Sequence, residues 1–176
     1  LNIANVMANK NIEGAVKLGI DALTIVSDES NIANAPAVAR ANNALHSIGL
    51  GAMNLHGYLA QNGIAYESET ARDFANVFFA TVNYWSLVRS NEIAKERGET
   101  YSGYEGSAYW DASYFEGYID NPPEPQSDKV RQLFEGIHVP TAQDWLDLEE
   151  NVTYDGLYHA YRLAIAPNGS ISYVQS

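Results

Sequence analysis

The first third of the chain repeats apolar positions with the period of an α-helix. Residues 11–26 carry an apolar stripe at Ile12, Val16, Ile20 and Leu23, which predicts an amphipathic helix. Pro36 is expected at or just before the start of the next element. Residues 48–52 are interpreted as a short buried strand or a turn, and residues 53–61 as a helix ended by Asn62 and Gly63.

The most regular pattern lies between Ser68 and Arg97 and predicts one helix of nearly thirty residues, about 45 Å long. Ser68 is expected to cap its N-terminus, and Gly98 follows its last residue. One face carries Phe74, Val77, Phe78, Thr81, Trp85 and Val88. A helix of this length is long for a free-standing domain of this size, so we expect it to pack across something larger.

The second half is rich in aromatic residues and then in short helices. Aromatic residues follow Ser107 at roughly helical spacing up to residue 118. Residues 121–125, Asn-Pro-Pro-Glu-Pro, break any regular element and are the best linker candidate. Helices are predicted for residues 127–135 and 141–150, the latter with a capping box between Thr141 and Asp144. We predict no separate domain boundary within residues 1–176.

The last apolar element, residues 157–166, leads into a segment that allows two interpretations. Asn168 and Gly169 between two apolar runs favour a two-residue β-hairpin, which is the better prediction on pattern alone. The alternative is a strand that leads into a loop and then a helix start. In that case backbone N–H groups and the hydroxyls of Ser170 and Ser172 would converge on a phosphate.

Composition and charge narrow the classes of function. The chain has 176 residues, 46% of them apolar, which is enough to build a core. With 22 acidic and 10 basic side chains the formal charge is −12, which disfavours nucleic acid and anionic lipid as partners. No apolar run is long enough to cross a bilayer. We therefore expect a cytoplasmic protein with neither nucleic acid nor membrane as a partner.

Candidate catalytic and metal-binding groups are few. The chain has no cysteine, which excludes disulfides, thiolate metal sites and a thiol nucleophile within it. The four histidines, His46, His56, His138 and His159, lack the spacing of a zinc helix and are predicted to be structural. The acidic residues from Asp144 to Glu150 are interpreted as a solvated helix face. The aromatic cluster at residues 109–118 suggests core or interface packing, or a platform for a sugar.

Five blocks of sequence, in one order along the whole chain, resemble the large catalytic subunit of ribonucleoside-diphosphate reductase, class Ib. They are residues 1–4 (LNIA), 48–58 (IGLGAMNLHGY), 82–97 (VNYWSLVRSNEIAKER), 156–167 (GLYHAYRLAIAP) and 169–175 (GSISYVQ). The resemblance implies an α/β fold in which this chain is the helix-rich part of a ten-stranded α/β barrel. Residues 1–176 would then be a partial catalytic barrel domain, about a quarter of a larger subunit.

The resemblance also implies an activity. The intact subunit would reduce ribonucleoside diphosphates to deoxyribonucleoside diphosphates by thiyl-radical chemistry. A thiyl radical removes the 3′ hydrogen, the 2′ hydroxyl leaves as water, and a cysteine pair supplies two electrons. The family's cysteines are expected outside residues 1–176, so no catalytic residue is predicted in this chain, and the fragment alone is expected to be inactive. The competing interpretation is an autonomous, aromatic-rich helical module that binds a sugar or a protein.

The family's substrate-phosphate loop corresponds to Pro167, Asn168, Gly169, Ser170, Ile171 and Ser172, which favours the loop over the hairpin. Asn168 stands where family members usually have threonine. The implied partners are the nucleotide substrate, the rest of the alpha subunit, a small beta subunit and a thioredoxin- or glutaredoxin-like reductant. The beta subunit would carry a dimetal–tyrosyl radical, and no cofactor is expected on this chain. The related cobalamin-dependent class is a weaker alternative.

Overall fold

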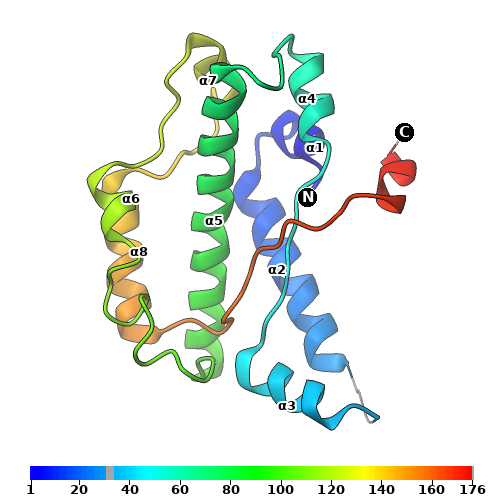
Figure 1. The fold of residues 1–176 in the computed structure, drawn as a ribbon. Coiled ribbons are helices and arrows are strands. Elements are labelled where there is room, and N and C mark those ends of the chain that lie inside the picture. The colour runs from blue at the N-terminus through cyan, green and yellow to red at the C-terminus, as the bar shows by residue number, and fades with distance from the viewer. Residues whose placement is uncertain (31–33, 176) are drawn as a thin grey trace.

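The computed structural model describes residues 1–30 and 34–175, and within them the regular structure is helical. The helices are α1 (Ile3–Ala8), α2 (Ile12–Glu29), α3 (Pro36–Leu45), α4 (Leu55–Gln61), α5 (Glu69–Arg97), α6 (Glu116–Asp120), α7 (Asp128–Leu133), α8 (Ala142–Asp155) and the 3₁₀ helix η1 (Ser170–Gln175). Figure 1 shows α2 and α5 side by side at the centre, with α6 and α8 flanking α5 and α1 beside α4.

The two long central helices start where their capping residues predict. The Asn11 side chain accepts a hydrogen bond from the backbone N–H of Gly14 at the start of α2. The Ser68 hydroxyl accepts one from Ala71 at the start of α5, and Gly98 ends α5 with a φ of 65°. The predicted 29-residue helix and both of its ends are therefore confirmed, while α2 continues three residues beyond the predicted end.

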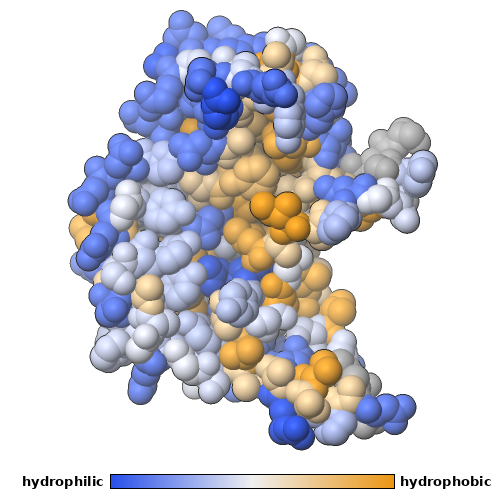
Figure 2. All heavy atoms as spheres, viewed as in Figure 1, coloured by the Kyte–Doolittle hydropathy of each residue, from blue (hydrophilic) through white to orange (hydrophobic). Residues whose placement is uncertain are grey.

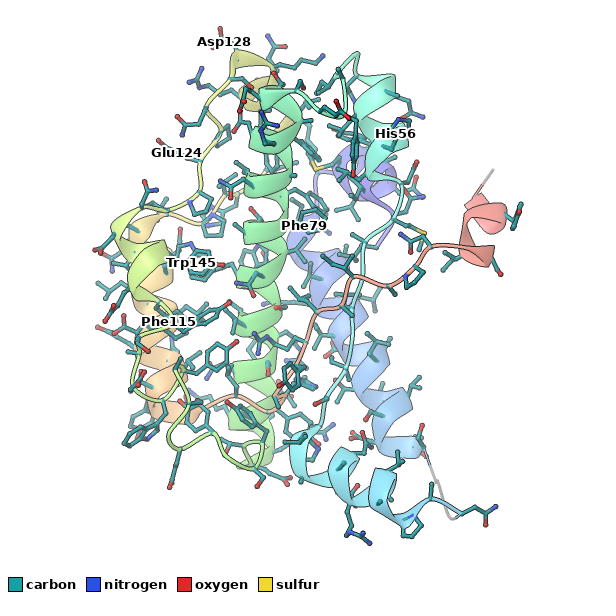
Figure 3. All side chains as sticks on the ribbon, in the orientation of Figure 1. His56, Phe79, Phe115, Glu124, Asp128 and Trp145 are labelled. Carbon is teal, nitrogen blue, oxygen red and sulfur yellow. The ribbon has the colours of Figure 1, made fainter. Side chains whose placement is uncertain are left out.

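Two hydrophobic clusters lie on either side of α5. The first joins α5 to α1, α2, α4 and α7, and includes Phe74 and Phe78. The second joins α5 to α8 and to the aromatic segment before α6, and is centred on Phe115 and Trp145. Both of these side chains lie between α5 and the layer formed by α6 and α8 (Figure 3). One helix thus contributes to both clusters, which explains its length.

The aromatic segment differs from the predicted helix. Residues 101–115 form successive turns, and only Glu116–Asp120 is helical. Gly103 and Gly106 have a φ of 89° and Ala112 a φ of 66°, values that a right-handed helix does not allow. The segment therefore turns back on itself and buries Tyr101, Tyr104 and Phe115 in the second cluster.

Two further boundaries were not anticipated. Helix α4 begins at Leu55 instead of residue 53, because Asn54 adopts a left-handed conformation with a φ of 66°. Helix α8 keeps the predicted capping box between Thr141 and Asp144 but continues to Asp155. Helix α3 begins at Pro36, where the start of an element was predicted, although its helical type was not. Helix α1 was not predicted, since it is too short to show a clear apolar period.

Three short extended segments are joined by parallel backbone pairing. The second, after α3, and the third, after α8, lie in front of α2 in Figure 1. Residues 1–3 pair with Met53, whose N–H donates to the Leu1 carbonyl at 2.8 Å. Leu50 pairs with residues 162–164, donating to the Arg162 carbonyl at 2.8 Å and accepting from Ala164 at 3.1 Å. Residues 48–52 are thus extended as predicted, but half-buried or, at Gly49, exposed.

The pairings at Asn2–Met53 and Leu50–Leu163 are isolated parallel bridges, and no longer strand occurs in residues 1–30 and 34–175. The helix-rich character of the prediction is confirmed, whereas a ten-stranded barrel is not seen in this chain. The surface that carries these segments is apolar in its centre (Figure 2), and Ile165 is fully exposed beside them. No helix in the described part of the chain combines the length and the apolarity needed to span a membrane.

Candidate functional site

The segment Pro167–Ser172 follows the third extended segment and projects from the helical body (Figure 1). Its first residues are irregular, and the 3₁₀ helix η1 begins at Ser170. The hairpin interpretation is therefore wrong, because residues that would form its second strand are helical. An extended segment, a loop and a helical turn follow one another, as the alternative requires.

The loop is open to solvent. Pro167, Asn168, Gly169, Ser170 and Ile171 are all exposed. Ser172 belongs to η1, but its side chain lies outside what the structure describes. The Asn168 amide donates a hydrogen bond of 3.4 Å to the carbonyl oxygen of Ala52. The loop is thus joined to the end of the central extended segment.

A cavity of about 630 Å³ lies beside this junction. Its lining is almost entirely apolar, with Asn168 contributing an amide. Phe79 reaches into this region from α5 (Figure 3). The remaining lining residues are Leu1, Leu50, Gly51, Ala52, Leu55, Tyr66, Val82, Leu163, Ala164 and Ile165. The combination of apolar walls and a polar loop at one side suits a ligand with an uncharged body and a charged end.

The segment before the loop is fixed by a buried histidine. His159 is fully buried between α2 and α5. Its Nε2 lies 2.9 Å from the Thr24 hydroxyl and its Nδ1 lies 3.0 Å from the Ser90 hydroxyl. Burial, and after it the charge of the nearby Arg162 guanidinium, lowers the pKa of His159 to about 3. This histidine is therefore neutral and structural, as predicted.

A second set of contacts holds the neighbouring residue, Tyr158. The ring of His46 stacks on Tyr158 with centroids 4.1 Å apart. Arg97 lies over the same ring at 4.5 Å, donates to the Tyr158 hydroxyl at 2.6 Å and pairs with Asp28 at 2.8 Å. The chain leading to the loop is consequently anchored to the ends of α2, α3 and α5.

Sequence reasoning missed Thr24, Ser86 and Ser90, the hydroxyl residues that receive this segment. All three are buried on the two central helices. Ser86 and Ser90 are four residues apart on α5, hence on one face of it. Small hydroxyl residues within an otherwise apolar helix face could have indicated a polar contact with another segment.

The described residues contain no group of three or more histidine, aspartate or glutamate side chains that could hold a metal ion. The aromatic residues of the 101–118 segment, except the exposed Trp110, belong to the second cluster or pack against it, and Tyr101, Tyr104 and Phe115 are buried there. A sugar-binding platform is therefore not supported.

Comparison with known proteins assigns the family. The family model described as ribonucleotide reductase, barrel domain, matches residues 1–176. The chain belongs to this family, which confirms the resemblance deduced from its sequence blocks.

Named relatives agree with this assignment. The chain is 61% identical over 176 residues to ribonucleoside-diphosphate reductase subunit alpha of Bacillus subtilis (strain 168), covering 100% of this chain and 25% of the relative. It is 59% identical over 176 residues to the NrdEB subunit alpha of the same organism, covering 100% of this chain and 16% of the relative. The subunit alpha of Mycoplasma pneumoniae is 42% identical over 182 residues, again covering 100% of this chain and 25% of the relative. The chain thus spans a quarter or less of the length of these relatives.

Proposed function

We propose that this chain is part of the catalytic alpha subunit of a ribonucleoside-diphosphate reductase of class Ib, which makes deoxyribonucleoside diphosphates in the cytoplasm. The observation that carries this proposal is the 61% identity over every residue of the chain to an alpha subunit of that name. The chain has no cysteine, so the thiyl radical and the reducing cysteine pair of the proposed reaction belong to other parts of the subunit. This chain contributes structure and substrate binding.

The three extended segments are proposed to be strands of the ten-stranded α/β barrel. They are parallel, and each is connected to the next through helices. Parallel strands require such crossover connections, which place the helices against the sheet. The barrel would be completed by strands from the remainder of the alpha subunit.

The loop Pro167–Ser172 is proposed to bind the diphosphate of the substrate. It lies at the carboxyl end of the third extended segment, and Ala52 lies near the same end of the second. Ligands of open parallel α/β sheets bind at the carboxyl ends of the strands. The exposed backbone and the hydroxyls of Ser170 and Ser172 can donate to phosphate oxygens in a chain whose overall charge of −12 would otherwise repel them.

The loop holds and orients the substrate, while the apolar cavity beside it excludes water from the uncharged part of the nucleotide. The proposed partners of the intact subunit are a small beta subunit carrying a dimetal–tyrosyl radical and a thioredoxin- or glutaredoxin-like reductant. The radical supplies the oxidising equivalent that starts the reaction. No residue of this chain is assigned to that step.

The proposal is tested in the full-length alpha subunit with Ser170→Ala and with the double variant Ser170→Ala, Ser172→Ala. Removing hydrogen bonds to a charged phosphate is expected to raise the KM for the nucleoside diphosphate by about 10- to 100-fold in the double variant. Ser113→Ala, an exposed hydroxyl in the aromatic segment, is the matched control and should leave KM unchanged. An unchanged KM in the double variant would refute the phosphate loop.

A further inference from the structure

Arg162 is a buried cation without a carboxylate partner in residues 1–30 and 34–175. The residue is only 5% exposed. Its Nε donates to the Ser86 hydroxyl at 3.4 Å, its Nη1 to the His159 carbonyl at 3.5 Å and its Nη2 to the Tyr109 hydroxyl at 2.9 Å. The guanidinium also lies 5.2 Å from the centre of the Tyr109 ring. All of these partners are uncharged.

Four surface arginines differ from Arg162 in this respect. Each of the four pairs with at least one carboxylate, although their side chains are between 18% and 62% exposed; they are Arg72, Arg89, Arg97 and Arg131. Arg40 on α3 forms no ion pair among the described residues, but it is exposed to water. A charge buried away from water is unfavourable unless an opposite charge and well-formed hydrogen bonds compensate it. Arg162 is the most buried arginine of the described residues, yet no opposite charge there compensates its own.

Arg162 has unused donors that are available to an oxyanion. A guanidinium has five N–H groups, and the three hydrogen bonds of Arg162 use one on each of its nitrogens. One N–H remains on Nη1 and one on Nη2. Such a pair matches the two oxygens of a carboxylate or of a phosphate group.

Space for an oxyanion lies next to this group. Arg162 lines a cavity of about 510 Å³ whose walls include no acidic residue. The other lining residues are Leu45, Asn83, Tyr101, Gly103, Ser107, Tyr109, Ala160, Tyr161 and Leu163. The wall thus offers further hydroxyl and amide groups around the guanidinium. None of the loop residues 167–172 lines this cavity.

We propose that this cavity is a second oxyanion site, in which Arg162 binds a carboxylate or phosphate group through both of its terminal nitrogens. The chain carries a net charge of −12, and this field disfavours a freely diffusing anion. The chain spans 25% of the length of a Bacillus subtilis relative, so most of such a subunit lies outside residues 1–176. We therefore expect the oxyanion to be a carboxylate side chain from that remainder of the same subunit.

The test uses the full-length alpha subunit and the variants Arg162→Met, which removes the charge, and Arg162→Lys, which keeps the charge but not the paired donors. Tyr109→Phe is the matched control, because it removes only one uncharged hydrogen bond of Arg162. Thermal unfolding is measured between about pH 7 and pH 2.5, a range that extends below the pKa of ordinary carboxylates. Each measurement is repeated in chloride, acetate and inorganic phosphate at equal ionic strength.

A carboxylate from the subunit predicts no effect of acetate or phosphate. It also predicts that Arg162→Met lowers the unfolding temperature more than Tyr109→Phe at pH 7. That difference should shrink as pH falls below about 4, because a carboxylate paired with arginine has a lowered pKa and loses its stabilisation as pH falls through that value. A diffusible oxyanion predicts that acetate or phosphate stabilises the wild type but not Arg162→Met, with Arg162→Lys intermediate.

Either pattern supports an oxyanion site, and the two patterns distinguish its source. The proposal is overturned if Arg162→Met is as stable as the wild type, or if its loss of stability is independent of both pH and buffer anion. Should Arg162→Met fail to fold, Arg162→Lys and the wild type in the three buffers give the same comparison.

Discussion

Asn168 and Ala52 are 116 positions apart in the sequence and are joined by a hydrogen bond of 3.4 Å from the Asn168 amide to the Ala52 carbonyl. This contact brings together the carboxyl ends of two parallel extended segments. The Asn168 side chain is thereby turned toward the body of the protein.

A negative charge at position 168 should weaken substrate binding. In the full-length subunit, Asn168→Asp keeps the size of the side chain but places a carboxylate beside the proposed diphosphate. We expect KM for the nucleoside diphosphate to rise by about tenfold or more, with a smaller effect at higher salt because the repulsion is screened. Steady-state kinetics at two salt concentrations measure this.

Asn168→Thr is the control for the charge, because threonine is polar but uncharged. It should change KM by about threefold or less, since the hydrogen bond to Ala52 is long and exposed. Equal KM values for the aspartate and threonine variants would contradict a phosphate near residue 168.

His159 should make the anchoring of the loop segment sensitive to acid. Burial lowers the pKa of His159 to about 3 in the folded chain, whereas an unfolded histidine titrates near pH 6.5. The unfolded state therefore binds the extra proton first, and stability falls as pH decreases below about 6.5. Between pH 6.5 and pH 5 the loss is on the order of 2 kcal/mol.

Hydrogen exchange in the full-length subunit measures this loss in peptides that cover residues 157–163. The free energy of opening of these peptides should be lower at pH 5 than at pH 7. His159→Asn, which cannot titrate in this range, should show a smaller difference between the two pH values. An identical pH dependence in wild type and variant would assign the acid sensitivity to other groups.

The parts of the fold that were predicted correctly depend on local chemistry. Ser68, Gly98 and the pair Thr141 and Asp144 act on backbone groups within a few residues of themselves, so their effect can be recognised from spacing alone. Asn54 could not be recognised in this way, because its left-handed conformation shows no pattern in sequence.

The loop illustrates where pattern alone is insufficient. Asn168 and Gly169 fit a hairpin turn as well as a loop, and only the resemblance to a family favoured the arrangement that the structure shows. Contacts of Arg162 with Ser86 and of His159 with Thr24 join segments 76 and 135 positions apart. No local period encodes such pairs, so sequence reasoning identified the position of the loop but not the groups that anchor it.

Gly98 should be required at the end of α5. Its φ of 65° lies in the left-handed region, and a Cβ added there would meet nothing within 4 Å. Gly98→Ala therefore tests conformational strain alone and should destabilise the protein by about 1 to 2 kcal/mol. Gly117→Ala, at a helical glycine that is equally free of close contacts, should be neutral or slightly stabilising. Thermal unfolding of both variants in the full-length subunit makes the comparison, and equal losses would contradict the assigned role of Gly98.

Trp145 and Trp110 provide a matched pair for the second hydrophobic cluster. Trp145 is 1% exposed, stacks on Tyr118 with centroids 4.1 Å apart and meets Tyr84 edge-on at 5.0 Å. Trp110 belongs to the neighbouring aromatic segment but is 51% exposed. Trp145→Ala should lower the free energy of unfolding by about 3 to 5 kcal/mol, because it leaves a cavity between α5 and α8.

Trp110→Ala should change the free energy of unfolding by about 0.5 kcal/mol or less, as is usual for surface positions. Chemical unfolding of the two variants, followed by circular dichroism and by hydrogen exchange in α8, measures both effects. If the aromatic segment instead served mainly to bind a ligand, Trp110→Ala would abolish that binding while Trp145→Ala left the fold intact. We expect instead that Trp145→Ala detaches α8 from α5 and that Trp110→Ala leaves the fold intact, because the Trp145 ring is buried between these two helices.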